Sequence, residues 1–458
     1  MVKLKRKYLI ALPWIGLLIL LSLLQANRLR EYYDELLNNT GLVFENFDKK
    51  LLEENEQAKQ DEERYERLLH SEGILPEGEE EQGSGESEEQ LSSIDPTTEP
   101  VKLGLHARSS LLMDGSNHRV LYEENGYKRM AMASTTKIMT CIVALENAKL
   151  DDIVEVSSYA ARMPDVQLNV RAGEQYYLKD LLYSLMLESH NDVAVALAEH
   201  VGGSVEGFAT MMNDKARSLG CENTNFVTPN GLDAEGHYTT ARDLAVIASY
   251  AIANPQFIEI TNTSSYSFKE IKKGRGFTVT NKNKFLYMME GAIGVKTGFT
   301  GDAGYCFVGA VKRNDSTFIS VVLGCGWPPH KSLKWSDTKQ LMSFGVSNYK
   351  LRQIFEKRNL EPLFVKKGQK KNAELYMEGD MKLLMRDDEK VTVEYHIPDY
   401  LEAPIKANTI VGDARYLING QYFTTIPIYT TKDIPRIDFK YCLLRILDIW
   451  NCNYKISE

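Results

Sequence analysis

Three short groups of residues in the chain combine side chains that can open an amide bond through a covalent intermediate. They are the S-x-x-K of Ser134 to Lys137, the S-x-N of Ser189 to Asn191 and the K-T-G of Lys296 to Gly298. A serine hydroxyl attacks a carbonyl when a base within hydrogen-bond reach takes its proton, and a neutral amine can be that base. The groups therefore indicate a serine nucleophile, Ser134, with Lys137 as its partner.

The setting of Ser134 and Lys137 supports this chemistry. Ile138 to Leu145 is almost wholly apolar, and a helix that is apolar on every side is a buried one. Side chains three residues apart on a helix share a face. Because burial disfavours the ammonium and lowers the pKa of a lysine, a neutral Lys137 can take the proton of Ser134. The alternative is a serine that caps the helix, followed by a lysine that faces solvent.

Ser189 and Asn191 stand between two predicted helices, one at Leu178 to Glu188 and the next from about Asp192. A turn between helices can direct both side chains into a cleft. There Ser189 can pass a proton toward a leaving amine, and Asn191 can orient Lys137 or the substrate amide. Simple capping of the second helix by Asn191 or Asp192 is the alternative, and the two roles are compatible.

The K-T-G group falls within Ile293 to Thr300, a predicted strand. Gly298 lets a substrate backbone approach closely, so an extended peptide can pair along the strand. Lys296 and Thr297 would then hold a terminal carboxylate, which suits an enzyme that recognises the free end of a peptide. The alternative is a surface strand that ends in a turn, and the apolar neighbour Val295 argues against it.

None of these motifs is specific by itself. A chain of 458 residues should hold about two chance S-x-x-K matches, about one S-x-N and about a tenth of a K-T-G. Further S-x-x-K matches do begin at Ser336 and Ser347. The ordered set of three carries the inference, because closely related elements mark penicillin-binding proteins and β-lactamases.

The elements that must position these residues form an α+β domain over residues 101–360. Strand-like runs come first, helical stretches follow, and strands return, which predicts one sheet built from both ends of the domain. The predicted strands are Leu103–Met113, Arg119–Tyr122, Ala292–Lys312 and Ser316–Gly324. The residues Arg313 to Asp315 predict a hairpin turn between the last two.

Two smaller segments follow this domain. Residues 361–432 alternate between apolar and polar, with a hairpin turn at Asn419-Gly420, and predict a small β-sandwich domain. Residues 433–458 predict a C-terminal amphipathic helix, which lies in a membrane interface or packs on the β domain. Its apolar face is Phe439, Leu443, Ile446, Leu447 and Trp450.

The beginning of the chain indicates a membrane attachment. Residues 1–27 hold a basic start followed by the apolar run Tyr8 to Leu24, which is typical of an uncleaved anchor. A cleaved signal peptide is the alternative, although the small-x-small pattern near Ala26 is poor. Both place the rest of the chain outside the cytoplasm. Residues 28–100 predict a helical stalk, as a coiled coil or a surface helix, and an acidic disordered linker.

Composition narrows the function classes. The net charge is -9, which provides no basic footprint for nucleic acid. The six cysteines form no CxxC pair, so a zinc or redox motif is not predicted, and most of the cysteines are expected to be small buried hydrophobes.

The motifs and their surroundings resemble the low-molecular-mass penicillin-binding proteins, the serine D-Ala-D-Ala carboxypeptidases of bacterial cell walls. The likeness spans Leu103 to Thr431. Its segments are Ala133–Thr140, Asn230–Leu232, His237–Leu244, Gly294–Thr300 and Ala303–Cys306. His190 departs from the family, which usually carries glycine there, so backbone strain is expected at His190.

The resemblance implies a penicillin-binding or β-lactamase-like transpeptidase domain and a catalytic mechanism. Ser134, activated by Lys137, attacks the carbonyl between the two D-alanines of a peptidoglycan stem pentapeptide, with help from Ser189. The backbone N–H groups of Ser134 and Phe299 would hold the oxyanion. The residues that would bind substrate are Asn191, Lys296, Thr297, Gly298 and Phe299. Water then releases the acyl-enzyme, β-lactams act as covalent inhibitors, and no metal or cofactor is required.

Two other functions remain compatible with the sequence. A β-lactamase uses the same serine and lysine but must deacylate rapidly. A catalytically idle cell-wall-binding scaffold would keep the fold without the reaction, and the intact motif residues argue against it. The sequence predicts a cell-membrane protein with an extracytoplasmic catalytic domain, or a secreted and peripherally attached one if residues 1–27 are cleaved.

Overall fold

The structure is a computed structural model that describes residues 101–450, with side chains described up to Leu447. The predicted anchor, stalk and linker at residues 1–100, and the last residues of the tail, lie outside the described residues. Within residues 101–450, no helix has both the length and the apolar character needed to span a bilayer.

A five-stranded antiparallel sheet forms the centre of the catalytic domain, with the strand order β2-β1-β9-β8-β7. The strands are β1 (Ser109–Asp114), β2 (Val120–Glu124), β7 (Ala292–Thr300), β8 (Gly304–Arg313) and β9 (Ser316–Leu323). The first two come from the start of the domain and the last three from its end. The prediction of an α+β domain with one such sheet is confirmed.

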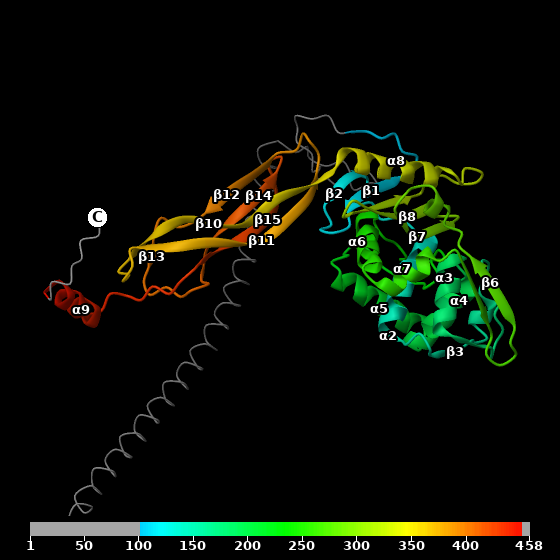
Figure 1. The fold of residues 1–458 in the computed structure, drawn as a ribbon. Coiled ribbons are helices and arrows are strands. Elements are labelled where there is room, and N and C mark those ends of the chain that lie inside the picture. Colours follow the sequence, from blue (N-terminus) through cyan, green and yellow to red (C-terminus); the bar gives the residue numbers. More distant parts are fainter. Residues whose placement is uncertain (1–100, 451–458) are drawn as a thin grey trace, which may run out of the picture. The chain divides into compact units, whose positions relative to one another are not determined.

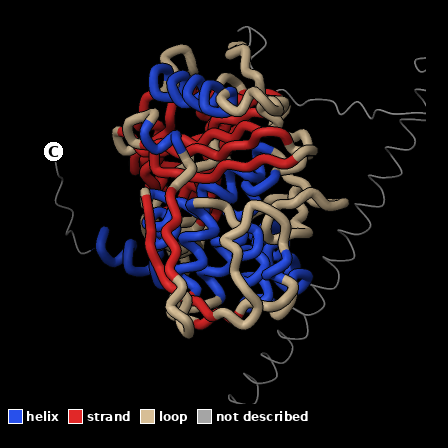
Figure 2. Tube along the Cα trace, turned by 90° about the vertical axis from the view of Figure 1, so that its right-hand side faces the viewer, coloured by secondary structure: helices blue, strands red, loops and turns tan. Residues whose placement is uncertain are grey.

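Helices cover both faces of this sheet. Helix α8 lies against one face, and α6 and α7 pack on the other, with further helices beyond them, as Figure 1 and Figure 2 show. The helices are α2 (Lys137–Asn147), α3 (Leu178–Leu187), α4 (Asn191–Gly202), α5 (Val205–Ser218), α6 (Ala241–Ile252), α7 (Pro255–Asn262) and α8 (Leu333–Asn348). The domain therefore has a helix–sheet–helix layering.

The side chains of β8 show why both faces are covered. Successive side chains of a strand point to opposite faces. Val308 and Ala310 belong to the larger core beneath the helical cluster, whereas Phe307 and Val311 belong to the core under α8. All four are fully buried. A strand that is apolar on both sides requires a layer on each side, and the helices supply both layers.

Two small hairpins flank the helical cluster. Strands β3 (Ile153–Glu155) and β4 (Gln175–Tyr177) pair with each other, as do β5 (Ser265–Lys269) and β6 (Gly276–Thr280). A long loop, residues 156–174, leaves β3 and returns to β4. Main-chain hydrogen bonds between Val156 and both Gly173 and Glu174 close its base. Short 3-10 turns complete the domain: η1 (Ala133–Thr136), η2 (Ala160–Arg162) and η3 (Lys284–Tyr287).

A second, β-rich domain follows α8. Its six strands form a sheet in the order β12-β14-β15-β11-β10-β13, and Ala414, Tyr416 and Ile428 are part of its own core. The strands are β10 (Lys350–Lys366), β11 (Asn372–Met385), β12 (Val391–His396), β13 (Leu401–Glu402), β14 (Ile410–Ile418) and β15 (Gln421–Thr430). The predicted hairpin turn joins β14 to β15, where Asn419 and Gly420 both have positive φ angles.

The tail contains helix α9 (Phe439–Trp450). Asp438 begins it by accepting a hydrogen bond from the Tyr441 N–H at 2.7 Å. Its described apolar side chains are exposed, and Phe439 has 81% of its surface open. The exposed set is Phe439, Leu443, Leu444, Ile446 and Leu447.

The cysteines of the described residues are free thiols. Four of them are buried, as the composition predicts, and Cys442 on α9 is exposed. The buried four are Cys141, Cys221, Cys306 and Cys325. Burial raises the pKa of the Cys306 thiol to about 12, so this cysteine is a packing residue in the neutral form.

Candidate active site

Ser134 lies in the 3-10 turn η1, three residues before the long buried helix α2 begins at Lys137. Ala133 precedes it with a φ of 49°, in the left-handed region that L side chains rarely adopt. The hydroxyls of Thr135 and Thr136 donate to the carbonyls of Met132 and Ala133 and secure the turn. The chain is thus bent sharply at the serine, and its environment holds the bend in place.

Lys137 is completely buried, and three oxygens surround its amine. Nζ lies 2.9 Å from Ser134 Oγ, 2.8 Å from Asn191 Oδ1 and 2.5 Å from the Asn230 carbonyl oxygen. Burial holds the pKa of Lys137 well below its ordinary value, and the nearby Lys296 lowers it further, while Asp192 acts in the opposite direction. Burial therefore favours the neutral amine over the ammonium form.

The three oxygen neighbours fix the direction of the amine's lone pair. A neutral amine has two N–H donors and one lone pair. The oxygens of Asn191 and Asn230 are pure acceptors, so they take the two N–H groups. The lone pair then faces the Ser134 hydroxyl, the one neighbour that can donate a proton. This arrangement suits general-base catalysis.

Asn191 is oriented by the tip of loop 156–174. Its Nδ2 donates to the carbonyls of Pro164 at 3.2 Å and Asp165 at 3.0 Å. Its main-chain N–H donates to the carbonyl of Val166 at 2.7 Å. Because both amide hydrogens are engaged there, Oδ1 must face Lys137. The capping alternative is not what the structure shows, since Asn191 is the first residue of α4 and its side chain does not cap the helix.

Ser189 occupies the turn between α3 and α4, as predicted from the sequence. Its φ of 73° is left-handed, and its buried Oγ has no hydrogen-bond partner among the described residues. A buried hydroxyl without a partner is costly in a stable protein. Backbone strain and an unpaired buried hydroxyl are features that cluster at active sites and binding sites.

The expectation of backbone strain at His190 is wrong. His190 has a φ of −65°, which any residue adopts, and the left-handed residue of the turn is Ser189. The His190 ring is buried, with Nδ1 2.7 Å from Ser184 Oγ and Nε2 3.4 Å from Glu188. Burial lowers its pKa. The turn accepts a large residue because the ring fills a polar niche beneath it.

Strand β7 brings the K-T-G residues to the other side of Ser134. Gly298 lies so close to the nucleophile turn that an added Cβ would be 3.0 Å from both the Ser134 nitrogen and the Ala133 Cβ. The lack of a side chain at Gly298 is what permits this approach. Phe299 follows with 43% of its surface exposed, and its ring packs at a tilt against Tyr305, with 4.6 Å between the ring centroids.

Lys296 is a second buried lysine of the site. Burial, together with the nearby Lys334 of α8, lowers its pKa to about 7. Its Nζ donates to the Thr297 carbonyl at 3.0 Å. A pKa near 7 lets Lys296 take up a proton when a carboxylate arrives, because the carboxylate favours the charged form of the lysine.

Sequence reasoning missed Lys334 and the full role of the Asn230-Gly231 segment. Lys334 is 8% exposed and lies 4.4 Å over the ring of Tyr305, and no local pattern marks it. Asn230 supplies the carbonyl for Lys137, and Gly231, at a φ of 80°, packs where an added Cβ would collide with the Ala133 carbonyl. The glycine after Asn230 was the feature of the sequence that could have revealed this segment.

The fold and the site together define a class of enzyme. A buried lysine with a lowered pKa beside a serine in a strained turn, with an S-x-N turn on one side and a K-T-G strand on the other, is the arrangement of the penicillin-binding serine acyl-enzymes. The chain belongs to the D-alanyl-D-alanine carboxypeptidase family, whose model matches residues 96–326. Residues 349–436 match the model of the penicillin-binding protein 5 C-terminal domain.

Individual relatives agree with this assignment. The D-alanyl-D-alanine carboxypeptidase DacF of Bacillus subtilis is 31% identical over 358 residues, which cover 76% of this chain and 91% of that protein. DacA of Haemophilus influenzae is 29% identical over 364 residues, covering 75% and 90%. The crystal structure of penicillin-binding protein 5 from Haemophilus influenzae aligns with a TM-score of 0.63 at 27% identity, over 74% of this chain and 100% of that one.

The family membership identifies the chain as a serine-type D-Ala-D-Ala carboxypeptidase, a hydrolase of peptidoglycan stem peptides that β-lactams acylate. No observation favours the β-lactamase or the idle scaffold over this enzyme. Membership of the family does not by itself assign a role in the reaction to each side chain.

Proposed function

We propose that this carboxypeptidase acts through Ser134 as its nucleophile and Lys137 as its general base. The observation that carries the proposal is the set of contacts around Lys137 Nζ, which leaves the lone pair facing a hydroxyl 2.9 Å away. The lowered pKa supplies the neutral amine that the step needs.

In the first half of the reaction, Ser134 Oγ bonds to the carbonyl carbon between the two D-alanines, and its proton moves to Lys137 Nζ. The N–H groups of Ser134 and Phe299 stabilise the oxyanion. The C–N bond then breaks, and the proton held by Lys137 passes by way of Ser189 to the leaving D-Ala amine, which makes Lys137 neutral again. A water molecule then attacks the ester on Ser134 and gives a proton to Lys137, and this proton returns to Ser134 Oγ as the ester C–O bond breaks.

The terminal carboxylate of the substrate is bound by the K-T-G strand. Lys296 and Thr297 contact it, and Lys334 adds positive charge from α8. The peptide extends along β7, where Gly298 leaves room for its backbone. Asn191 forms a hydrogen bond with the substrate amide, as acceptor or as donor. A substrate without a free carboxylate should therefore bind poorly.

Penicillin labelling tests the nucleophile. The full chain is incubated with a fluorescent penicillin and with diacetyl-Lys-D-Ala-D-Ala, alongside Ser134→Ala and the control Ser336→Ala. Ser336 begins another S-x-x-K but is exposed on α8. Stable labelling and D-Ala release should be lost in Ser134→Ala only. Rapid penicillin turnover would indicate a β-lactamase instead, and absence of labelling in the parent would indicate a scaffold.

We also propose that the enzyme is held at the cell membrane with its catalytic domain outside the cytoplasm. The basic start and apolar run of residues 1–27 support an N-terminal anchor. The exposed apolar side chains of α9, among them Phe439 and Ile446, support a second contact at the membrane interface.

Fractionation of cells tests this location. N-terminal sequencing of the mature protein distinguishes an anchor that begins at Met1 from cleavage near Asn27. With an intact anchor, deletion of residues 438–458 leaves the protein in the membrane fraction. Recovery of the full chain from the soluble cytoplasm would contradict the proposal.

A further inference from the structure

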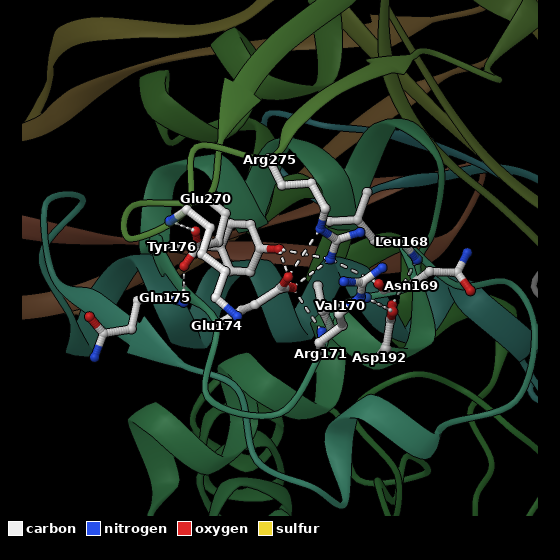
Figure 3. Close-up of polar contacts among 11 residues, drawn as sticks. Leu168, Asn169, Val170, Arg171, Glu174, Gln175, Tyr176, Asp192, Glu270 and Arg275 are labelled. Carbon is white, nitrogen blue, oxygen red and sulfur yellow. Dashed lines mark hydrogen bonds and ion pairs between the residues drawn. The ribbon is translucent and has the colours of Figure 1, made fainter.

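An ion pair outside the catalytic cluster holds the loop that orients Asn191. Glu174 stands at the end of loop 156–174, and Arg275 lies just before β6 in the neighbouring hairpin. Arg275 Nε is 3.0 Å from Glu174 Oε1, and Nη2 is 2.5 Å from Oε2, so the guanidinium binds the carboxylate through two parallel contacts. Figure 3 shows the Arg275 guanidinium pointing at the Glu174 carboxylate beside the Tyr176 hydroxyl.

The Glu174 carboxylate is almost fully buried and saturated with donors. It also accepts from the Tyr176 hydroxyl at 2.7 Å and from the Arg171 N–H at 2.8 Å. Burial alone would raise the pKa of Glu174, but the hydrogen bonds from Arg275, Tyr176 and Arg171 outweigh it and leave the pKa lowered. The ion pair is therefore a fixed link between the hairpin and the loop.

The loop is held from two directions on the way to its tip. Arg275 Nη2 donates to the Asn169 carbonyl at 3.0 Å. From the opposite side, the Asp192 carboxylate accepts from the N–H groups of Leu168 at 3.0 Å and Val170 at 3.2 Å (Figure 3). The backbone a few residues before, at Pro164 and Asp165, is the part that holds the Asn191 amide.

The same hairpin also holds the other side of the S-x-N turn. Glu188, which precedes Ser189, accepts from the Thr280 N–H at 3.0 Å and from Lys282 at 2.9 Å. Both donors belong to β6 or follow it directly. The β5–β6 hairpin is thus attached to the turn at two places, directly through Glu188 and indirectly through Arg275 and the loop.

We propose that Arg275 and Glu174 are positioning residues for the reaction. By fixing loop 156–174, they keep Asn191 Oδ1, rather than its NH2 group, against Lys137. The lone pair of Lys137 then stays directed at Ser134. This inference rests on the proposed function, because it assumes that Lys137 is the base.

Loss of the ion pair should shift the pKa of Lys137, and the direction of the shift distinguishes positioning of Asn191 from simple support of the loop. When the Asn191 amide turns, the amine of Lys137 loses an acceptor, and the ammonium form loses more than the neutral form. The pKa of Lys137 then falls further. If the loop only shielded the site, its loosening would admit water and raise that pKa instead. The charged and titratable groups that face Lys137, namely Lys296, Asp192 and His190, are the same in both cases.

The test compares Arg275→Gln and Glu174→Gln with the control Arg242→Gln in the full chain. Arg242 is matched to Arg275: its Nε lies 2.6 Å from Glu123, and its guanidinium stacks 4.0 Å over Tyr127. Arg275 stacks 4.4 Å over Phe277. Acylation by fluorescent penicillin, and kcat and KM for the D-Ala-D-Ala tripeptide, are followed against pH, and thermal unfolding is measured for every variant.

Both loop variants should acylate about tenfold more slowly or worse, with a larger loss in kcat than in KM for the tripeptide. The acid limb of the acylation profile should move to lower pH, and Arg275→Lys should recover part of the rate. Arg242→Gln should lose stability only. Unchanged acylation in both loop variants, or an acid limb that moves to higher pH, overturns the inference. A parent that is not labelled at Ser134 refutes the proposed function instead, which is a different result.

Discussion

Replacement of Lys296 by methionine should stabilise the protein, and by an amount that depends on pH. Lys296 is 2% exposed, and burial beside Lys334 lowers its pKa from 10.5 to about 7. In the unfolded chain the same side chain binds its proton up to a much higher pH. Folding therefore has to bury an ammonium group, or remove its proton, and either costs free energy.

The magnitude follows from the two pKa values. At about 1.4 kcal/mol for each pH unit, the cost below pH 7 is roughly 5 kcal/mol. It declines as pH rises, to roughly 2 kcal/mol near pH 9, and it vanishes above the unfolded pKa. Because the folded pKa is the lower one, the unfolded state binds more protons across this range, so the parent gains stability as pH rises. Methionine has a similar length and no charge, so the substitution removes this dependence of stability on pH.

Urea unfolding of the parent and of Lys296→Met, followed by tryptophan fluorescence, measures the difference. The advantage of the variant should shrink by about 2 to 3 kcal/mol between about pH 6 and pH 9. Lys312→Met is the control, because Lys312 is exposed on the adjacent strand β8, and its effect should be small and flat. An advantage of Lys296→Met that stays constant across this range would refute the reasoning.

Further predictions concern the nucleophile and its neighbours. Gly298→Ala adds a methyl group 3.0 Å from the Ser134 nitrogen and should slow acylation at least about tenfold with little loss of stability; the stopped-flow rate of penicillin labelling measures this. Gly231→Ala combines a collision with a φ of 80° and should lower the free energy of unfolding by about 2 kcal/mol or more; denaturant titration that finds no change would contradict it. Acylation should decline only as pH falls through the lowered pKa of Lys137, well below the ordinary lysine value; a decline that begins near the ordinary lysine pKa would show that the base is charged at rest. His190→Gly should keep the acylation rate and cost about 1 kcal/mol of stability; a faster enzyme would mean that the histidine does strain the turn.

The contact between Ser134 and Lys137 was predictable because their relationship is local. Ser134 and Lys137 are three residues apart at the start of an apolar helix, so spacing and burial could both be inferred from the sequence. The structure adds that the serine lies in a 3-10 turn behind a left-handed Ala133. Backbone strain of this kind leaves no trace in an alanine, and the sequence did not reveal it.

The sheet was predictable in outline for a similar reason. Runs of alternating or continuous apolar residues indicated strands at both ends of the domain, and the turn after Arg313 joined β8 to β9 as expected. The strand order, with β1 next to β9, depends on which apolar faces pack together. No local pattern specifies that choice, because many pairings of the same strands would bury similar surfaces.

Lys334 beside Lys296 and the Arg275–Glu174 ion pair were not predictable. Lys334 belongs to a helix and Arg275 to a hairpin whose sequences resemble many others. The strain expected at His190 was found at Ser189 instead, because a backbone angle is set by how two helices pack and not by the residue type alone. Long-range contacts of this kind exist only after the chain has folded.

The sequence by itself determined which chemical groups the protein has and the class of reaction they can perform. It contained a hydroxyl and an amine one turn apart, a second hydroxyl and an amide in a turn, and a cation followed by a glycine on a strand. Only the tertiary structure decided their protonation and direction. Burial lowers the pKa of Lys137 because water is excluded, and the amine is aimed at one oxygen because other oxygens occupy its N–H groups. Both conditions are created by segments far from Lys137 in the chain.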